Sequence, residues 1–429
     1  RGRPLNDGHC MTAEAMPRGF VALMLAQFVS ALADNAVLIV AIALLAARGE
    51  PVWMAPLLKF GFIASYVVFA LVVGVLADAW SKPRVMMATN ALKAVGCAAM
   101  LAGVHPLAAY AVIGFGAAAY SPAKYGLMVE LLPPGRLVAA NAWLEALTIA
   151  SVILGTLTGG MLIAPEFATL MRRGFDAFAP SGAASPAMPK SALAAALVVV
   201  LLLYALAALA NRFVPDSGRR YRLPRTGIAA LAGDFGRALR TLARDREGRV
   251  SLAVTSLLWG VGTALQFVVL DWGCHALALT LDRASMLQGV VAIGVAAGAV
   301  LAARTVPLAR APGLLPFGML FGPLLLCMLA ITRLHTALPM MAVLGAVAGF
   351  FIVPMNALLQ HRGVVLLNAG QSIAVQNFCE NLSVMVMLAL YAGLRRAELP
   401  LPWIIAALAA WVSLAMAGIL FAHRRQAPA

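Results

Sequence analysis

The sequence predicts an all-α polytopic membrane protein in which twelve transmembrane helices form two six-helix pseudo-repeats. Of its 429 residues, 62% are hydrophobic and only 11% are charged, whereas a soluble domain usually carries about a quarter charged residues. Twelve mostly apolar runs approach the roughly 20 residues that a helix needs to cross a bilayer. They lie near 20–46, 55–77, 85–103, 106–130, 139–163, 191–214, 250–271, 284–308, 314–332, 338–360, 370–394 and 400–421.

A long basic segment divides these runs into two groups of six. An even number of spans places both termini on one side, and the Lys and Arg residues of the short loops on that side predict that it is cytoplasmic. We therefore expect five parts: an N-terminal segment (1–19), a first bundle (20–214), a linker (215–249), a second bundle (250–421) and a tail (422–429). Residues 164–190, rich in Pro, Ser and Gly, are expected to form a periplasmic insertion in the first bundle.

The linker itself contains a helical pattern. Ile228, Leu231, Phe235, Leu239 and Leu242 recur at helical spacing, with arginines between them. This pattern is typical of an amphipathic helix that lies on a membrane surface, here the cytoplasmic one. The alternative interpretation is a plain connection between the two bundles.

An internal repeat supports the division into halves. In the first half, "AAYSPAKYG" is followed by "NAWLEA", which contains Asn141 and Glu145. In the second half, "FFIVPMNALLQ" is followed by "QNFCEN", which contains Gln376, Asn377 and Glu380. Each half thus has a proline-containing helix followed by a helix with an amide and a glutamate, as parallel six-helix repeats of transporters predict.

The connection between the second and third runs carries a recognisable pattern. It reads "GVLADAWSKPR", with Gly74, Asp78, Lys82 and Arg84 at the spacing of a glycine, an acid and two following basic residues. Gly74 allows close helix packing, Asp78 can cap a helix start, and the two basic residues can meet a carbonyl end or an acid. With twelve spans, this pattern indicates the major facilitator superfamily, although Ser81 replaces the usual glycine and Pro83 interrupts the basic residues.

Several ionisable residues lie inside the apolar runs. A charge in mid-membrane costs roughly 2.5–3.5 kcal/mol on insertion scales, so such residues face a cavity or a partner. They are Asp34 beside Asn35, Lys93, Lys124, Glu145 and Glu380. Because opposite buried charges tend to pair, Asp34, Lys93, Lys124 and Glu145 are candidates for one buried set of charges. Structural alternatives stay open: the two glutamates could brace helix ends through loop arginines, and Lys124 could pair with Glu145 or Glu130.

Composition and absent motifs exclude other classes. The net charge is +15, but the arginines stand in short segments between apolar runs, which predicts contact with anionic membrane lipids and not with nucleic acid. The five cysteines form no C-x-x-C pair, and no H-E-x-x-H, H-x-x-x-x-D or G-K pattern occurs. The sequence therefore predicts no metal, no cofactor and no enzyme. Met11 or Met16 is the expected natural start.

The chain resembles the bacterial lysophospholipid transporters, a branch of the major facilitator superfamily, along nearly its whole length. The resemblance rests on "AQFVSALADNAVLIVAIALL", "VGVLADAWSKPRVMMATNALK", "GAAAYSPAKYG", "VTSLLWGVGTALQF", "FFIVPMNALLQ" and "NAGQSIAVQNFCEN". It implies ATP-independent movement of lysophospholipids, such as 2-acyl-glycerophosphoethanolamine, from the outer to the inner leaflet of the bacterial inner membrane. There an acyltransferase/acyl-carrier-protein synthetase, here a separate protein, would re-acylate them.

The resemblance also assigns roles to residues. Asp34 and Lys124 match the membrane-embedded charges of the family, and its polar positions are matched by Asn35, Lys93, Glu145, Asn377 and Glu380. By this resemblance, Asp34 would bind the head-group amine or a coupling cation, and Lys124 the phosphodiester. Gln266 stands where the relatives are expected to carry arginine, so Lys124 would take a larger share of phosphate binding.

Two expectations concern mechanism. The bundles would rock about a central site, while Gly74, Asp78, Lys82 and Arg84 latch their cytoplasmic ends in the outward-open state. The rival interpretation is a proton-coupled exporter of drugs or small metabolites on the same fold, with Asp34 as the proton carrier. A dependence of transport on the proton gradient would favour this rival.

Overall fold

Helices form the fold in the part of the chain that the computed structural model describes, which is residues 18–50, 54–164, 166, 169, 192–219, 227–279 and 281–425. The first group comprises α1 (Arg18–Ala47), α2 (Met54–Val68), α3 (Ala70–Ala79), α4 (Lys82–Leu101), α5 (Pro106–Leu131), α6 (Leu137–Ile163) and α8 (Ala192–Ala210). The second comprises α10 (Arg246–His275), α11 (Leu281–Thr305), α12 (Leu315–Gly318), α13 (Phe321–Cys327), α14 (Leu334–Leu366), α15 (Ala369–Arg396) and α16 (Leu401–Arg424). Between them lies α9 (Ile228–Arg244), and most of the expected insertion at 164–190 falls outside the described residues.

The observed helices agree with twelve spans. Eight described helices are long and apolar enough to cross a membrane, and two bent pairs raise this number to ten. The other two are α4 and α5, with 20 and 26 residues. At about 1.5 Å per residue both can cross a bilayer, but they are more polar because they carry buried charges.

Two of the expected runs are not straight helices. The run at 55–77 is bent by 64° between α2 and α3, and the run at 314–332 is bent by 43° between its two halves. In the second of these runs a proline lies on each side of the break: Pro316 in α12 ("LPFG") and Pro323 in α13 ("FGPLLLC"). Proline has no backbone N–H to donate and disfavours a continuous helix. The apolar run therefore predicted one straight helix where the structure has two shorter ones.

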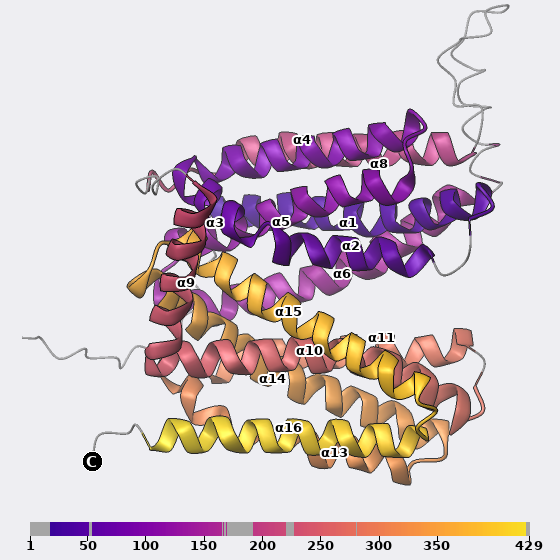
Figure 1. Cartoon of the computed structure of the whole chain (residues 1–429), viewed down its shortest axis with the longest axis vertical. Helices are drawn as coiled ribbons and strands as arrows, with labels where there is room; N and C mark the ends of the chain where they lie inside the picture. The colour runs from indigo at the N-terminus through magenta and orange to yellow at the C-terminus, as the bar shows by residue number, and fades with distance from the viewer. Residues whose placement is uncertain are drawn as a thin grey trace, which may run out of the picture.

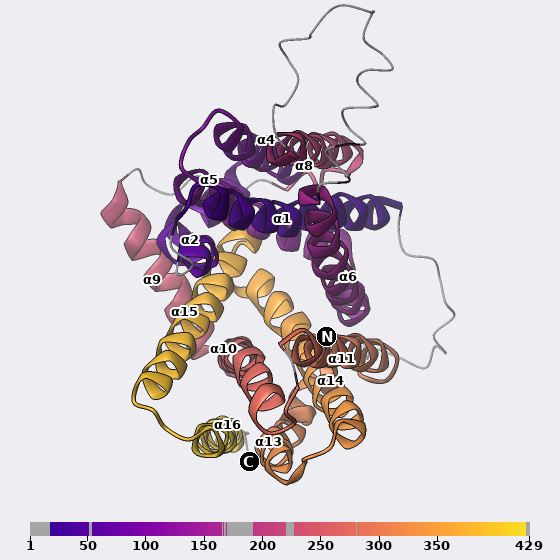
Figure 2. The ribbon, with the colours of Figure 1, turned by 90° about the vertical axis from the view of Figure 1, so that its right-hand side faces the viewer.

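The two groups form separate bundles that meet along two seams. Figure 1 shows the first bundle above and the second below, with the spanning helices running side by side and α9 across one end. Figure 2, seen along the helices from the opposite end, places α6 and α15 between the bundles. Helix α15 packs against α2, α3 and α5, and α6 packs against α11 and α14. Because these two helices carry the repeated glutamates, the repeat brings Glu145 and Glu380 to the two seams.

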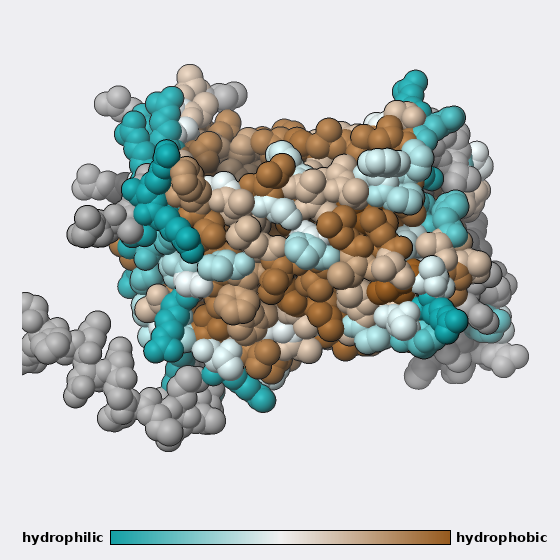
Figure 3. Space-filling view, turned by 90° about the horizontal axis from the view of Figure 1, so that it is seen from below, coloured by the Kyte–Doolittle hydropathy of each residue, from teal (hydrophilic) through white to brown (hydrophobic). Residues whose placement is uncertain are grey.

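The outer surface is that of a membrane protein. Figure 3 shows a broad apolar band between hydrophilic ends, and the end that carries α9 is on its left. Large apolar side chains such as Trp143, Leu157, Ile293 and Leu414 are exposed on the helices of this band. A water-soluble protein rarely exposes so large a contiguous apolar surface, so the band is the surface that faces lipid.

Helices α11 and α14 pack at very short range. A side chain added at Gly298 of α11 would meet the backbone of Ala346, and one added at Gly349 of α14 would meet the backbone of Val295. Small residues at such an interface let helix backbones approach, which is the main route to tight packing inside a membrane. Glycine spacing therefore fixes the distance between these two helices.

Replacing Gly349 with alanine should loosen this contact. Since the new methyl group would meet backbone atoms that cannot rotate away, we expect Gly349→Ala to lower the free energy of unfolding by about 1–3 kcal/mol. The matched control is Gly418→Ala on α16, where an added methyl group meets nothing within 4 Å. Thermal unfolding of the purified variants in detergent measures the difference, and equal midpoints for the two variants would contradict this account.

Candidate functional site

The first group of buried charges forms an ion pair inside the first bundle. Lys93 Nζ of α4 lies 2.7 Å from Asp34 Oδ2 of α1, and the Tyr204 hydroxyl of α8 donates to Asp34 Oδ1 at 2.9 Å. Lys93 also donates to Ser30 Oγ at 3.1 Å, and Ser30 donates to Asn90 Oδ1 at 2.7 Å. The predicted pairing is thus found for these two residues. Asn35, the neighbour of Asp34, donates to the carbonyl of Ala31 in its own helix.

Lys124 lies near this pair and outside it. Its Nζ donates to Gln27 Oε1 at 3.3 Å and stands 4.4 Å from the centre of the Tyr125 ring. Gln27 in turn donates to Thr148 Oγ1 of α6 at 3.2 Å. The charge of Lys124 also acts on Glu145, although the two make no direct ion pair within 4 Å. Lys124 is therefore held by a neutral amide and an aromatic face.

Glu130, the other expected partner of Lys124, is engaged elsewhere. It pairs with Lys82 Nζ at 2.8 Å, and both side chains are fully buried. Glu130 also accepts a hydrogen bond from the Ser217 hydroxyl at 2.5 Å. The structural alternative of a pair between Lys124 and Glu130 is therefore not observed.

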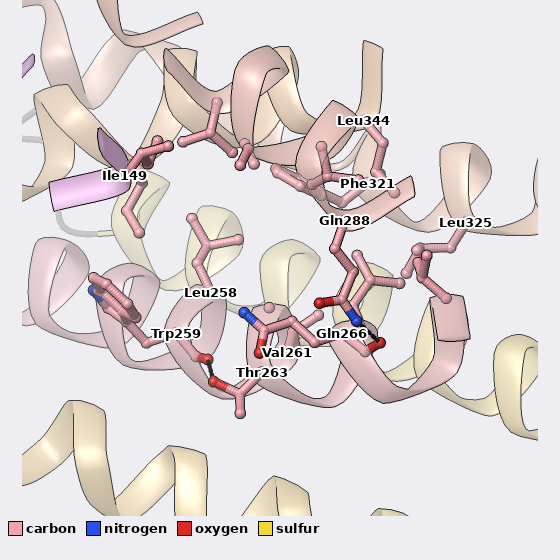
Figure 4. Close-up of a pocket in the computed structure, with 18 of the residues that line it drawn as sticks. Ile149, Leu258, Trp259, Val261, Thr263, Gln266, Gln288, Phe321, Leu325 and Leu344 are labelled. Carbon is pink, nitrogen blue, oxygen red and sulfur yellow. Dashed lines mark hydrogen bonds between the residues drawn. The ribbon is translucent and has the colours of Figure 1, made fainter. Parts of the chain in front are cut away.

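A cavity of about 260 Å³ lies between α6 and the second bundle. Its walls are mostly apolar side chains of α10, α11, α13 and α14, among them Leu258, Phe321 and Leu344, as Figure 4 shows. Glu145 and Ile149 line it from α6. The predicted residue Gln266 also lines it, and Gln288 Nε2 donates to the Gln266 carbonyl at 2.9 Å. This arrangement suits an amphiphilic molecule, with an apolar part against the second bundle.

Glu380 is held inside its own seam. Gln376 Nε2 donates to Glu380 Oε1 at 2.8 Å and to Asn356 Oδ1 at 3.1 Å. Asn377, the residue after Gln376, donates a hydrogen bond to Ser121 Oγ of α5 at 2.8 Å and so links the two bundles. Of the two repeated glutamates, one is thus fixed by an amide and the other lines the cavity.

The bundles are joined at the α9 end. Asp78 of α3 accepts hydrogen bonds from the backbone N–H groups of Gly370 at 2.7 Å and Gln371 at 3.0 Å. Both donors belong to the first turn of α15, where unpaired N–H groups attract a carboxylate. An added side chain at Gly74 would meet Ala374 of α15, so the glycine permits this approach. The capping expected for Asp78 is therefore seen, and the helix that it caps belongs to the other bundle.

The other two residues of this pattern behave differently. Lys82 opens α4 and turns inward to Glu130, whereas Arg84, also in the first turn of α4, is exposed. The connection before this helix is shorter than the run expected at 85–103 implies, because Pro83 occupies a first-turn position that suits proline and α4 begins at Lys82. Sequence patterns do not separate an inward-turning lysine from an exposed arginine two residues away.

A further link across the bundles was missed from the sequence. Asn141 of α6 and Gln360 of α14 exchange two hydrogen bonds, at 2.9 and 3.0 Å, and both are buried. A signal was present, since these amides stand in the two repeated motifs. A reciprocal amide pair satisfies both partners at once, which is the condition for burying them.

Helix α9 covers the seam at this end. Phe235 packs with Val73 and Ala119 of the first bundle and with Ala374 of the second, and its ring stands edge-on to Phe378 at 5.3 Å. Ala238 and Leu242 are buried against α10, α14 and α15. The predicted amphipathic helix is present, but the expectation that its apolar face lies on the membrane surface was wrong, because that face packs against both bundles.

The junction of α9 and α10 is fixed to α14. Asp245 accepts from Arg362 Nε at 2.9 Å and from the Gly248 N–H at 2.8 Å, so it caps the start of α10. The Arg362 guanidinium, through this hydrogen bond, holds the pKa of the Asp245 carboxyl below its ordinary value. The linker is thereby anchored to the second bundle.

Two six-helix bundles around a partly polar cavity define a membrane transporter of the two-domain class. The family model of the Major Facilitator Superfamily matches residues 23–388. The Lysophospholipid transporter LplT of Yersinia pestis (strain Pestoides F) is 40% identical over 387 residues, covering 88% of this chain and 87% of the relative. The protein of that name from Yersinia pseudotuberculosis serotype O:3 (strain YPIII) matches equally. The chain therefore belongs to the major facilitator superfamily and, within it, to the lysophospholipid transporter family.

Solved structures agree on the fold. The transporter FucP in its outward conformation gives a TM-score of 0.70 at 17% identity, with 96% of this chain and 99% of that chain covered. A bacterial homologue of the iron transporter ferroportin, in an outward-facing state, gives 0.69 at 13% identity, with 94% and 99% covered. At these sequence identities, the similarity shows only that the helices are arranged in the same way.

The Asp34–Lys93 pair should be a strong structural element. Lys93→Met leaves a buried carboxylate without its counter-charge, so we expect a loss of about 3–5 kcal/mol in the free energy of unfolding. The double variant Asp34→Asn/Lys93→Met should recover most of that loss, since both charges are then gone. Arg84→Met, at an exposed position of the same helix, is the control. Thermal unfolding in detergent tests this, and additive losses in the double variant would contradict it.

Proposed function

We propose that this protein moves lysophospholipids, such as 2-acyl-glycerophosphoethanolamine, across the bacterial inner membrane. The observation that carries the proposal is the 40% identity to lysophospholipid transporters over 88% of the chain. The cavity supports this proposal, because most of its lining side chains are apolar while Glu145 and Gln266 add polar groups. An acyl chain fits the apolar walls, and a charged head group fits the polar side near α6.

The head group would lie among the charges at the bundle interface. Lys124, whose described contacts are a neutral amide and a ring, is free to bind a phosphodiester oxygen. Glu145 and Glu380 position the head group or gate its passage. Asp34 would accept a head-group amine or a coupling cation only by exchange with Lys93, which holds it at 2.7 Å.

Transport would proceed by alternating access, in which the bundles rock about the central site. We assign the α9 end to the cytoplasm, so both termini are cytoplasmic, and we take the contacts of Asp78 with α15 as the latch of an outward-open state. Gly74 lets the bundles approach, and Lys82 with Glu130 keeps α4 and α5 together. Delivery to the inner leaflet would hand the lipid to a separate acyltransferase/acyl-carrier-protein synthetase.

One observation favours a second candidate. A buried carboxylate that contacts a lysine and a tyrosine, as Asp34 does, is also the arrangement that a proton-coupled exporter of drugs or metabolites would use. The two candidates differ in substrate and in their dependence on the proton gradient. Collapsing that gradient would stop the exporter and leave facilitated lipid movement unchanged.

Uptake of radiolabelled 2-acyl-glycerophosphoethanolamine into spheroplasts that lack their own transporter tests the proposal. We expect the wild-type chain to restore uptake with or without a proton gradient. Lys124→Ala should reduce uptake at least tenfold, because the loss of a charged hydrogen bond costs about 1.5–3 kcal/mol. Asp34→Ala should also abolish uptake. Equal membrane levels and a single size-exclusion peak serve as controls for folding. A folded wild-type protein that restores no uptake would contradict the proposal that this protein transports lysophospholipids.

The latch makes a separate prediction. Asp78→Asn removes the charge that holds two N–H groups of α15, so we expect the population that is open at the α9 end to rise about tenfold or more. Spin labels at Trp80 and Val365, which are both exposed at that end and belong to different bundles, report the opening as a longer distance. Glu50→Gln, at the other end of α1, is the control. An unchanged distance distribution in Asp78→Asn would refute the latch.

A further inference from the structure

The cavity between α6 and the second bundle has two unlike ends. Figure 4 shows Trp259 of α10 at one end and Phe321 with Leu325 of α13 toward the other. The Trp259 side chain is 37% exposed, whereas Phe321 and Leu325 are only 4% and 1% exposed. The cavity therefore narrows from an open mouth at Trp259 to an enclosed end at α13.

The enclosed end lies inside the second bundle. Figure 2 shows α13 on the side of α10 and α14 that faces away from α6. Side chains of α10, α11 and α14 line the cavity between α6 and α13. A ligand that fills the cavity from end to end must therefore pass between α10 and α14 into the core of the second bundle.

The enclosed end is apolar. The lining side chains that α13 and α14 contribute are Phe321, Leu325, Leu344, Ala348 and Ile352. Among the described lining residues, the ionisable one, Glu145, belongs to α6. Protein interiors contain few voids larger than a water molecule, and apolar voids stay dry. A cavity of about 260 Å³ with such an end is therefore suited to a hydrocarbon chain.

The enclosed end is held in place from behind. The ring centre of Phe321 lies 6.5 Å from that of Phe351, which is 1% exposed. A side chain added at Gly318 would meet the Phe351 ring of α14, and one added at Gly322 would meet Ser413 of α16. Because the chain on both sides of Phe321 packs so closely, this ring has no room to withdraw and gives the cavity a fixed depth.

We propose that the second bundle itself holds the acyl chain of the lysophospholipid, and that Phe321 limits the length of chain that fits. This inference rests on the proposed function and adds to it the position of the chain and a residue that selects for chain length. Lipid tails are as apolar as the cavity, so methylene groups that fit gain little by entering. Methylene groups that do not fit stay in the polar mouth, where two of them weaken binding about tenfold.

A lysolipid with a photoreactive diazirine at the last carbon of its acyl chain tests where the chain lies. We expect this derivative of 2-acyl-glycerophosphoethanolamine to label Phe321, Leu325 or Leu344 of the purified protein, as mapped by mass spectrometry of peptides. An excess of the unlabelled lysolipid should prevent that labelling. Labelling confined to lipid-facing residues such as Ile293 and Leu414, which are 65% and 72% exposed, would overturn the inference.

Variants of the lining test the limit on chain length. Unlabelled lysolipids that differ by two methylene groups compete with the probe, and beyond the limit each such pair should weaken competition about tenfold. Phe321→Ala deepens the cavity and should move the limit to longer chains, while Ala348→Leu fills the lining and should move it to shorter ones. Phe317→Ala is the matched control, because Phe317 is 53% exposed on α12 and lies outside the lining.

Each comparison is made between two chain lengths in the same variant, so a loss of folded protein cancels. A limit that stays the same in the wild type, Phe321→Ala and Ala348→Leu would overturn the role of Phe321. A limit that moves equally in Phe317→Ala would do so as well.

Failure of transport and failure of this inference can be told apart, because cross-linking requires binding and no transport step. Labelling of α13 that the competitor prevents, in a protein that restores no uptake, would uphold the acyl-chain site and reject the transport proposal. Uptake without labelling of α13 or its neighbours in the lining would uphold transport and reject the acyl-chain site. The absence of both would reject both.

Discussion

The need to neutralise charge inside a membrane-spanning fold organises this protein. Lys82 with Glu130 and Lys93 with Asp34 are ion pairs formed by side chains that lie largely or wholly out of water. Burial of either charge without its partner would cost several kcal/mol, so each ion pair holds its two helices together. Both pairs join helices of the first bundle. The charges therefore make α1, α4 and α5 one body before any contact with the second bundle is considered.

Contacts between the bundles have a different chemistry. Asp78 meets backbone N–H groups of α15, while Asn141 with Gln360 and Ser121 with Asn377 form neutral hydrogen bonds. A neutral hydrogen bond contributes only about 0.5–1.5 kcal/mol, and water can replace either partner when the seam opens. Strong, desolvated pairs inside the first bundle, combined with exchangeable hydrogen bonds between the bundles, suit a rigid-body rocking of one bundle against the other. Phe235 of α9, seated across the same seam, adds an apolar contact that must also separate when this end opens.

The sequence predicted the helices and the repeat because both depend on patterns that local physics enforces. Runs of about 20 apolar residues mark spans whatever surrounds them, and the glutamates of α6 and α15 occupy corresponding seams. Partner choice could not be read in the same way. Lys124 and Lys82 are both lysines near acids in sequence, yet one contacts Gln27 and the other Glu130. That difference arises from helix rotation and tilt, which packing between helices sets and no periodicity records.

The same packing explains why three acids in similar apolar surroundings differ in what they can do. Asp34 lies where α4 and α8 present a lysine and a tyrosine, and Glu380 lies one helical turn from Gln376. Glu145 instead faces the second bundle, whose contribution to the cavity is apolar. A site built from a charged edge on one bundle and an apolar wall on the other matches an amphiphile whose ends differ in polarity. The head group and the acyl chain of such an amphiphile would then contact different bundles, which move relative to one another in the proposed transport cycle. Movement of the bundles would then change the contacts of the head group and the acyl chain separately, so release of one need not wait for release of the other.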